Sequence, residues 1–408
     1  TFAEMLGRGG YRTGFYGKWH VAEHNGRYLG WSNTHGPRQQ GFDEAEEDFG
    51  GHSYGTLATA PTSGPDGIES GRFPTDSMTE KAIQFLERNQ KRPFCLEVAH
   101  FFVHDPLKAP ARWLFERARK RTGVESDEAA AHIAMVETLD HHVGQLLGAV
   151  DRLGLRENTL IIFTSDNGGL ATVEGPSTPS TINAPLREGK GYLYEGGIRV
   201  PLLVRGPGIA AGSTTTNAMS SVDYFPTILE LAGLPLVESR ESKVEGKPVT
   251  PTALDPRPST LDQLDGVSLA PLLKGGPAPA ARPLFWHYPH YSNQGGKPGG
   301  AIREDDFKLI EFYETGRVEL FDLKSGENRN LAEDPAHAAR VKAMVGKLDT
   351  WRIKTGAQMM QPNPNYHPSP QAASGNITML GKDADVHGAM LRFEPLPHKN
   401  TLVFWVNA

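Results

Sequence analysis

The sequence has almost no cysteine, no long apolar run and no cluster of basic residues. Its single cysteine among 408 residues, Cys95, excludes a disulfide scaffold and any zinc site built on cysteines. No stretch of about 18 consecutive apolar residues occurs, so the sequence predicts no membrane-spanning helix. The net charge is −6, and lysines and arginines do not cluster, which argues against a nucleic-acid-binding protein.

The composition that remains is that of a globular protein. The hydrophobic residues amount to 38% of the chain and 45 glycines add to them, which excludes a wholly disordered chain and a collagen. A chain of this length holds two or three domains, or one large α/β domain with an appendage.

Strand-like and helix-like segments alternate through the first half of the chain. Thr1 and Glu4 have the spacing of a capping box, which predicts a helix up to Gly7. Buried strands are expected at 11–16, 94–103, 159–164 and 198–204, and amphipathic helices at 77–89 and 130–153. This alternation predicts an α/β fold with a mostly parallel central sheet sandwiched by helices.

The second half of the chain has a different texture. Residues 236–262 are polar and proline-rich, and we expect a surface insertion there. A hairpin at 307–323 and a helix at 336–353 predict a smaller C-terminal α+β subdomain with an antiparallel sheet. We therefore expect domains at 1–280 and 281–358, a linker at 359–374 and the strands of a further module at 375–408.

The segment S-D-N-G-G at 165–169 follows a predicted strand directly. In open α/β sheets, ligands bind beyond the carboxyl ends of the strands. Asp166 and Asn167 would offer the hard oxygen ligands that Ca²⁺ or Mg²⁺ prefers. The other interpretation is a plain turn, which Asn-Gly-Gly also forms well.

The segment G-K-W-H at 17–20 lies at another strand end. Alternate residues of a strand share a face, so Lys18 and His20 can point to one place. A lysine beside a titratable histidine suits an anionic substrate and proton transfer. A solvated lysine and a structural histidine are the alternative.

Two histidines, His100 and His104, end the apolar run at 94–103. A zinc site on this pair is not indicated, because no third ligand has matching spacing and no H-E-x-x-H motif occurs. We expect His104, in the loop, to be functional and His100 to be buried packing. His141 and His142, in the middle of a predicted helix, are interpreted as partly solvated.

The glycine-rich segment at 188–201 lets backbone approach a ligand closely. Lys190 in this segment could contact an anion, although a P-loop is excluded by the absence of its motif. For Glu195 and Arg199 we favour a buried ion pair that holds the loop over a catalytic role.

These segments, in this order, resemble the sulfatase family of the alkaline-phosphatase-like superfold. The resemblance covers about residues 1–350. Its motifs are G-Y-R-T-G-F-Y-G-K-W-H at 10–20, L-D-x-x-V-G at 139–144, S-D-N-G at 165–168, G-K-G-x-x-Y-E-G-G-I-R-V-P at 189–201 and D-Y-F-P-T at 223–227. It implies a sulfatase that hydrolyses a sulfate ester of a carbohydrate or aryl alcohol.

The resemblance also implies roles for individual residues. A divalent cation, Ca²⁺ with Mg²⁺ as the other candidate, would be held partly by Asp166 and Asn167. Lys18 and Lys190 match the lysines that neutralise the sulfate oxygens. These positive charges offset the negative charge on the non-bridging oxygens of the ester.

Two histidines complete the implied catalytic set. His20 matches the histidine beside the nucleophile, which helps to expel sulfate from the covalent intermediate. His104 matches the histidine near the leaving-group oxygen, where a proton donor is needed because charge builds up on that atom as the ester bond breaks.

The nucleophile that the resemblance implies is a formylglycine, made from the Cys or Ser of a C/S-x-P-x-R motif. No such motif occurs in this sequence, and Cys95 lies in the apolar stretch P-F-C-L-E. We therefore interpret the chain as part of a longer sulfatase without its nucleophile segment; a degenerate relative is the alternative. The residues at 375–408 resemble the truncated start of an accessory β-sandwich.

The expected partner is a sulfated small molecule or polysaccharide, with no nucleic acid and no membrane span. Oligomeric state is not predicted, and the resemblance implies a periplasmic or extracellular location. Two other functions stay open: a phosphonate or phosphate monoester hydrolase of the same superfold, and a non-catalytic carbohydrate-binding protein.

Because the nucleophile motif is missing, we predict that the 408-residue chain does not turn over 4-nitrophenyl sulfate. Release of 4-nitrophenolate measures this directly. Hydrolysis that is lost in His104→Ala would show instead that the nucleophile lies within the chain.

Overall fold

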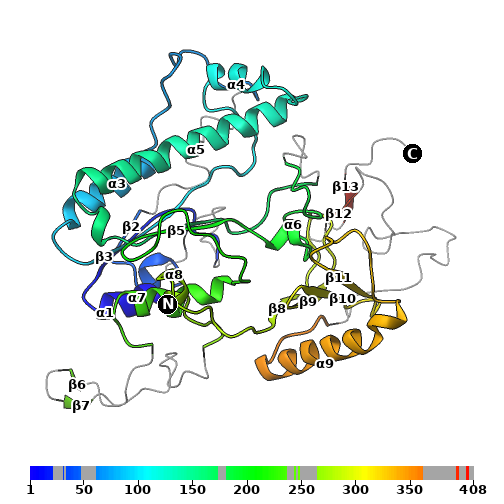
Figure 1. Cartoon of the computed structure of the whole chain (residues 1–408). Coiled ribbons are helices and arrows are strands. Elements are labelled where there is room, and N and C mark those ends of the chain that lie inside the picture. The colour runs from blue at the N-terminus through cyan, green and yellow to red at the C-terminus, as the bar shows by residue number, and fades with distance from the viewer. Residues whose placement is uncertain are drawn as a thin grey trace, which may run out of the picture. The chain divides into compact units, whose positions relative to one another are not determined.

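The computed structural model describes residues 1–21, 31, 34–46, 61–172, 181–236, 243–244, 247–248, 264–361, 392–394 and 401–403 (Figure 1). The chain divides into two compact units, residues 1–162 with 203–280 and residues 163–202 with 281–408. Most of the expected insertion at 236–262 and of the further module at 375–408 lies outside the described residues.

A parallel sheet forms the centre of the first unit. Its strands are β1 (Arg12–Gly17), β2 (Glu44–Ala45) and β3 (Phe94–Ala99), in the order β2-β1-β3. β1 pairs in parallel with both neighbours, and its register with β3 ends at Gly17 opposite Ala99. The carboxyl ends of β1 and β3 are therefore level with each other.

Helices cover both faces of this sheet. Neighbouring residues of a strand point to opposite sides, so adjacent apolar residues of β1 need a packing partner on each face. Tyr16 packs against Phe85 of α3 (Ser77–Asn89) on one face. Phe15 packs against Ala3 of α1 (Phe2–Arg8) on the other. α5 (Asp127–Arg152) lies beside α3, and α4 (Arg112–Arg119) packs on α5 (Figure 1).

Shorter elements complete this part of the chain. β4 (Ile161–Thr164) and β5 (Leu202–Arg205) form a two-stranded sheet, and the division into units falls within both strands. The remaining elements are η1 (Pro37–Gln40), η2 (Arg156–Asn158), η3 (Ser221–Asp223), α7 (Tyr224–Leu231), α8 (Ala270–Leu273), β6 (Lys243–Val244) and β7 (Lys247–Pro248).

An antiparallel sheet of four strands forms the second unit. Its order is β11-β10-β9-β8, with β8 (Leu284–Tyr288), β9 (Gly299–Glu304), β10 (Phe307–Phe312) and β11 (Val318–Asp322). α9 (Ala338–Thr355) buries Met344 and Leu348 against Leu309 and Leu320 of the sheet. The unit also holds α6 (Glu195–Ile198), η5 (Pro335–His337) and the antiparallel pair β12 (Arg392–Glu394) and β13 (Thr401–Val403).

The predicted fold class is confirmed: parallel strands with helices in the first unit, and a four-stranded antiparallel sheet in the second. Two details of the predicted strands differ. β3 ends at Ala99 because residues 101–104 turn back on themselves, with the His104 N–H donating to the Phe101 carbonyl. β5 starts at Leu202 because 195–198 is helical. Residues 163–202 group with the C-terminal residues.

Phe85 is the largest apolar side chain between α3 and β1, and it is fully buried. We predict that Phe85→Ala lowers the free energy of unfolding by about 3–5 kcal/mol, because the truncation leaves a cavity. Urea denaturation measures the change. The exposed neighbour Gln84 on the same helix is the control, and Gln84→Ala should change the stability by less than about 0.5 kcal/mol. A loss below about 1 kcal/mol for Phe85→Ala would contradict this packing.

Candidate active site

In the first unit, the candidate residues lie at the carboxyl edge of the parallel sheet. The Lys18 backbone N–H donates to the Ala99 carbonyl at 2.8 Å. The segments that follow β1 and β3 therefore begin side by side. Lys18 and His20 follow β1, and His104 follows β3. The structure therefore brings these three residues to one edge, which is where α/β sheets bind ligands.

Trp19 anchors the segment that carries Lys18 and His20. Its ring packs edge-on against Phe15, with 5.1 Å between ring centroids, and its Nε1 donates to the His35 carbonyl at 3.0 Å. Trp19 is itself partly buried against the core, Lys18 is half-buried and His20 is exposed. The sequence around Trp19 carries no pattern that predicts this anchoring role.

His104 has an oriented imidazole. Its Nδ1 lies 3.0 Å from the Asp105 carbonyl oxygen. Because a carbonyl only accepts hydrogen bonds, Nδ1 must be the donor, which assigns its proton. Nε2 is then the ring nitrogen at which a proton can be gained and passed on.

His100 has a different environment from His104. Neither of its ring nitrogens has a hydrogen-bond partner, and burial lowers the pKa of His100 to about 4. The negative charge of Asp76 raises this pKa and the neighbouring His142 lowers it further, but burial dominates. His100 is a neutral packing residue, as the sequence indicated.

His142, which was expected to be partly solvated, is buried and stacks on Phe102.

In the second unit, Asp166 and Asn167 form the turn after β4. The Asn167 backbone N–H donates to Asp166 Oδ1 at 2.9 Å, and the Asn167 side-chain amide donates to the Gly168 carbonyl at 2.9 Å. This arrangement uses the Asn167 amide nitrogen within the turn, so Oδ1 is the side-chain atom of Asn167 that would be available to a cation. Asp166 is exposed and Asn167 is half-buried.

Backbone contacts bring Lys190 to the same turn. The Lys190 N–H donates to the Gly169 carbonyl at 3.1 Å, and the Gly168 N–H donates to the Gly197 carbonyl at 2.9 Å. A Cβ on Gly168 would lie 1.7 Å from the Gly196 carbonyl oxygen, so this approach requires glycine. Lys190, Asp166 and Asn167 therefore belong to one interlocked pair of loops.

The donor set at this turn suits a hard cation. A carboxylate and an amide oxygen on adjacent residues are the kind of ligand that Ca²⁺ takes, usually as part of six to eight oxygens. Within the residues that the structure describes, no group of three or more His, Cys, Asp or Glu side chains is placed to hold a metal ion. Asp166 and Asn167 would supply two of these oxygens.

Cys95 lacks the properties of a nucleophile. It is largely buried in β3, and burial raises the pKa of its thiol to about 12. A thiol attacks as the thiolate, so Cys95 is inert near neutral pH. This agrees with its interpretation as a strand residue.

The main ion-pair partner of Glu195 was missed. The predicted ion pair of Glu195 with Arg199 is present at 3.9 Å, but Arg199 is 63% exposed. Lys308 of β10, which is fully buried, lies 3.1 Å from Glu195 and 3.0 Å from Glu327. The available signal was a lysine inside the apolar strand F-K-L-I at 307–310.

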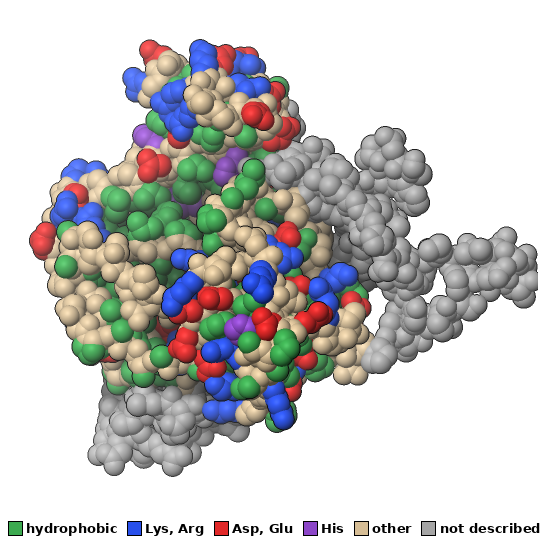
Figure 2. Space-filling model, turned by 45° about the vertical axis from the view of Figure 1, so that its right-hand side comes forward, with side chains coloured by type: hydrophobic (Ala, Val, Ile, Leu, Met, Phe, Trp, Pro, Cys, Tyr) green, Lys and Arg blue, Asp and Glu red, His purple; other side chains and the backbone are tan. Residues whose placement is uncertain are grey.

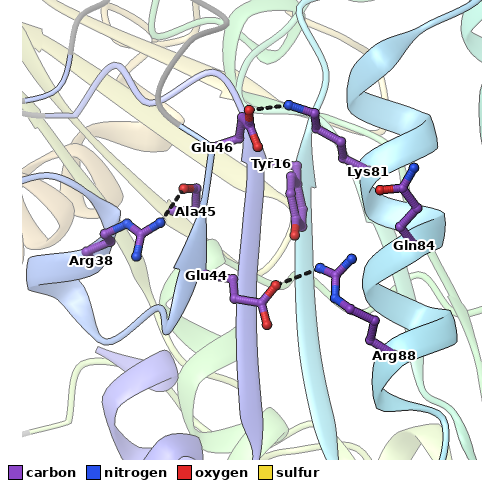
Figure 3. A pocket seen from close by; sticks show the side chains of 8 residues that line it. All are labelled: Tyr16, Arg38, Glu44, Ala45, Glu46, Lys81, Gln84 and Arg88. Atoms are coloured by element: carbon purple, nitrogen blue, oxygen red, sulfur yellow. Dashed lines mark hydrogen bonds and ion pairs between the residues drawn. The ribbon is translucent and has the colours of Figure 1, made fainter.

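A polar pocket of the first unit lies elsewhere, between β1, β2 and α3 (Figure 3). Tyr16 stands between two ion pairs, Glu44 with Arg88 at 2.7 Å and Glu46 with Lys81. The residues that line the pocket include none of the candidate site residues. We interpret the side chains around this pocket as an ion-pair network that links the short strand β2 to α3.

The described part of the chain contains no helix long and apolar enough to cross a membrane. On the face shown in Figure 2, Lys and Arg side chains are interspersed with Asp and Glu, and its described surface has no continuous basic area.

The neutral His100 predicts a pH dependence of stability. Its pKa is about 4 in the folded chain and about 6.5 when unfolded, so the unfolded chain binds the proton more readily. Stability should therefore fall as the pH drops from 6.5 towards 4, by at most about 3 kcal/mol. Urea unfolding at several pH values measures this contribution as the difference between the wild type and His100→Phe. Substitution of the exposed His290 serves as the control. If the free energy of unfolding of His100→Phe depended on pH as that of the wild type does, His100 would not be the group responsible.

Comparison with known proteins extends these observations. Residues 1–234 match the family model described as Sulfatase, and residues 244–354 match the one described as N-sulphoglucosamine sulphohydrolase, C-terminal. A protein named Sulfatase from Formosa agariphila is 30% identical over 309 residues, which cover 69% of this chain and 51% of that protein. Arylsulfatase A of Homo sapiens is 32% identical over 315 residues, which cover 72% and 55%. The chain spans about half the length of these curated relatives.

Solved structures share the fold. The crystal structure of Ps i-CgsB in complex with k-i-k-neocarrahexaose has a TM-score of 0.62 at 24% identity, and the match covers 88% of this chain and 76% of that one. The phosphonate monoester hydrolase SpPMH from Silicibacter pomeroyi has a TM-score of 0.58 at 17% identity, covering 94% and 84%. Because the Sulfatase family model matches more than half of the residues, the chain belongs to the sulfatase family, with its alkaline-phosphatase-like fold.

Proposed function

We propose that this chain carries most of the active site of an enzyme that hydrolyses sulfate esters. The observation that supports this most is the joined pair of loops in the second unit, where Lys190 hydrogen-bonds to the turn that follows Asp166 and Asn167. The ammonium group of Lys190 and a metal ion held by Asp166 and Asn167 would together offset the negative charge of a sulfate group bound between them.

Two groups of the proposed reaction are not side chains of this sequence. Ca²⁺ would offset negative charge on the sulfate oxygens, and a formylglycine would supply the nucleophile. Asp166 and Asn167 would contribute oxygen ligands to the cation, in accordance with their exposed position after β4.

The side chains of this chain would bind the ester and move protons. Lys18 and Lys190 would hold the non-bridging sulfate oxygens, which carry the negative charge. His104 would donate a proton from Nε2 to the leaving-group oxygen, since its Nδ1 proton is held by the Asp105 carbonyl. His20, exposed beyond β1, would exchange a proton next to the nucleophile.

For the substrate we propose a sulfated carbohydrate. Support comes from the relatives: the matching structure of Ps i-CgsB is a complex with neocarrahexaose, and the C-terminal family model is named for a sulphoglucosamine sulphohydrolase. A periplasmic or extracellular location would suit a polysaccharide substrate, and cell fractionation would test it.

A phosphonate monoester hydrolase is the second candidate. The similar fold of the Silicibacter pomeroyi enzyme favours it, because the same cation and lysines would hold a phosphonate oxyanion. Sulfate monoesters and phosphonate monoesters both carry one negative charge at neutral pH, so the charge of the substrate does not separate the two activities. A substrate panel that contains both kinds of ester separates them by their relative rates of turnover.

We predict that the protein made from its complete reading frame hydrolyses 4-nitrophenyl sulfate and a sulfated sugar. Lys190→Ala should lower kcat/KM by at least ~100-fold, because it removes an interaction with the charged oxygens. Lys324→Ala is the matched control: this lysine of the same unit is 73% exposed, pairs with Asp306 and should leave kcat/KM unchanged.

Three outcomes would decide between the candidate functions. Turnover of sulfate esters that depends on Lys190 supports the proposal. Faster turnover of a phenyl phosphonate monoester supports the second candidate. Binding of sulfated sugar without turnover of any ester would favour a non-catalytic protein and contradict both.

A further inference from the structure

A lysine lies fully buried in the second unit, on strand β10. Lys308 has 0% exposure, and its Nζ lies 3.1 Å from Glu195 Oε1 and 3.0 Å from Glu327 Oε1. Glu327 Oε2 in turn accepts the backbone N–H of Glu195 at 2.6 Å. Both carboxylates are almost completely buried. The ammonium group thus joins β10, α6 and the chain near 327.

A buried charge of this kind confines its partners strongly. An ammonium group removed from water is stable when carboxylates replace its hydration, and loss of one partner leaves an uncompensated charge. Burial raises the pKa of Glu327, and the positive charge of Lys308 opposes this shift. Arg303 adds a further positive charge 3.9 Å from Glu195 Oε2. Glu195 therefore has little freedom to move away from Lys308.

The residues just before Glu195 are attached to the same sheet. The guanidinium of Arg187 lies 4.0 Å from the centre of the Tyr194 ring and donates to the Glu327 carbonyl at 3.3 Å. The Tyr194 hydroxyl donates to Glu319 Oε2 of β11 at 2.6 Å. Residues 187–195 are thus held at their beginning and at their end, and Lys190 lies between the two attachments.

The residues just after Glu195 contact the Asp-Asn turn. Gly196 donates its N–H to the Arg187 carbonyl at 2.8 Å, and the Gly197 carbonyl accepts the Gly168 N–H at 2.9 Å. A Cβ on Gly197 would lie 2.2 Å from the Tyr192 carbonyl oxygen and 2.5 Å from that of Gly189. The backbone has no room here, so a shift of Glu195 displaces both loops.

We propose that Lys308 is a positioning residue that sets the location of Lys190 and of the Asp166–Asn167 turn through Glu195. The catalytic meaning of this role rests on the proposed function, in which Lys190 binds the anion and Asp166 and Asn167 hold the cation. Lys308 itself is fully buried and acts through the backbone of residues 187–197.

The test is amide hydrogen exchange of the full protein with Lys308→Met, read for the segments 165–172 and 187–199. We expect exchange there to rise by at least ~10-fold, while exchange in α9 changes only as far as the global stability does. The matched control is Glu311→Gln, on the same strand, which removes a charge from the half-buried pair of Glu311 with Arg352 of α9. In this variant the two segments should exchange as in the wild type.

A second variant covers the case in which Lys308→Met does not fold. Glu195→Gln keeps the volume of the side chain and leaves Lys308 paired with Glu327, so it retains the fold. We expect the same local rise in exchange at 187–199. Equal protection of this segment in Glu195→Gln and in the wild type would overturn the proposal, as would a rise in Lys308→Met that is the same in α9 and in the two segments.

The positioning role and the proposed function can fail separately. A local rise in exchange together with turnover that does not depend on Lys190 would preserve the positioning role and overturn the proposed chemistry. Turnover that depends on Lys190, with no local rise in exchange, would preserve the proposed chemistry and overturn the positioning role. A loss of kcat/KM in Glu195→Gln that accompanies the local rise supports both.

Discussion

A lysine that is completely removed from water needs negative charges beside it, and this constraint organises the second unit of the structure. Lys308 meets it with Glu195 and Glu327, which come from segments far apart in the sequence. The requirement brings residues 187–197 onto the antiparallel sheet, and the glycines next to Glu195 then determine where the Asp166–Asn167 turn lies. The local geometry around Lys190 is thus a consequence of charge burial in the core.

The first unit places its candidate residues by a different principle. Parallel strands share one carboxyl edge, and the level ends of β1 and β3 bring the segments that carry Lys18 and His104 to that edge. The Trp19 ring packs on Phe15 between these two positions in the sequence, with Lys18 half-buried before it and His20 exposed after it. Sheet register and aromatic packing position these side chains, whereas buried charge positions those of the second unit.

Local sequence patterns predicted the elements whose signals are themselves local. The helix at 77–89 was predicted with its final bounds, because its apolar positions recur with the helical period and Asp76 caps its first turn. The strand at 94–103 was predicted four residues too long, since the apolar run continues through Phe101 and Phe102 while the backbone already turns. An apolar run shows burial but not the point at which a strand ends.

The order of the motifs along the chain by itself determined the family and the fold class, through its resemblance to the sulfatases. This was possible because residues such as Asp166, Asn167 and Lys190 stand in strand-end and glycine-rich segments, which local sequence patterns reveal. The partners of buried charges were decided only by the tertiary structure. Arg199 is four residues from Glu195 and was the natural choice from spacing. It does pair with Glu195 at 3.9 Å but remains mostly exposed, and the buried partner of Glu195 is Lys308, 113 residues away. Spacing shows which residues can meet along a helix or strand, whereas the energetic cost of burying a charge is known only once the fold shows which groups lose their water.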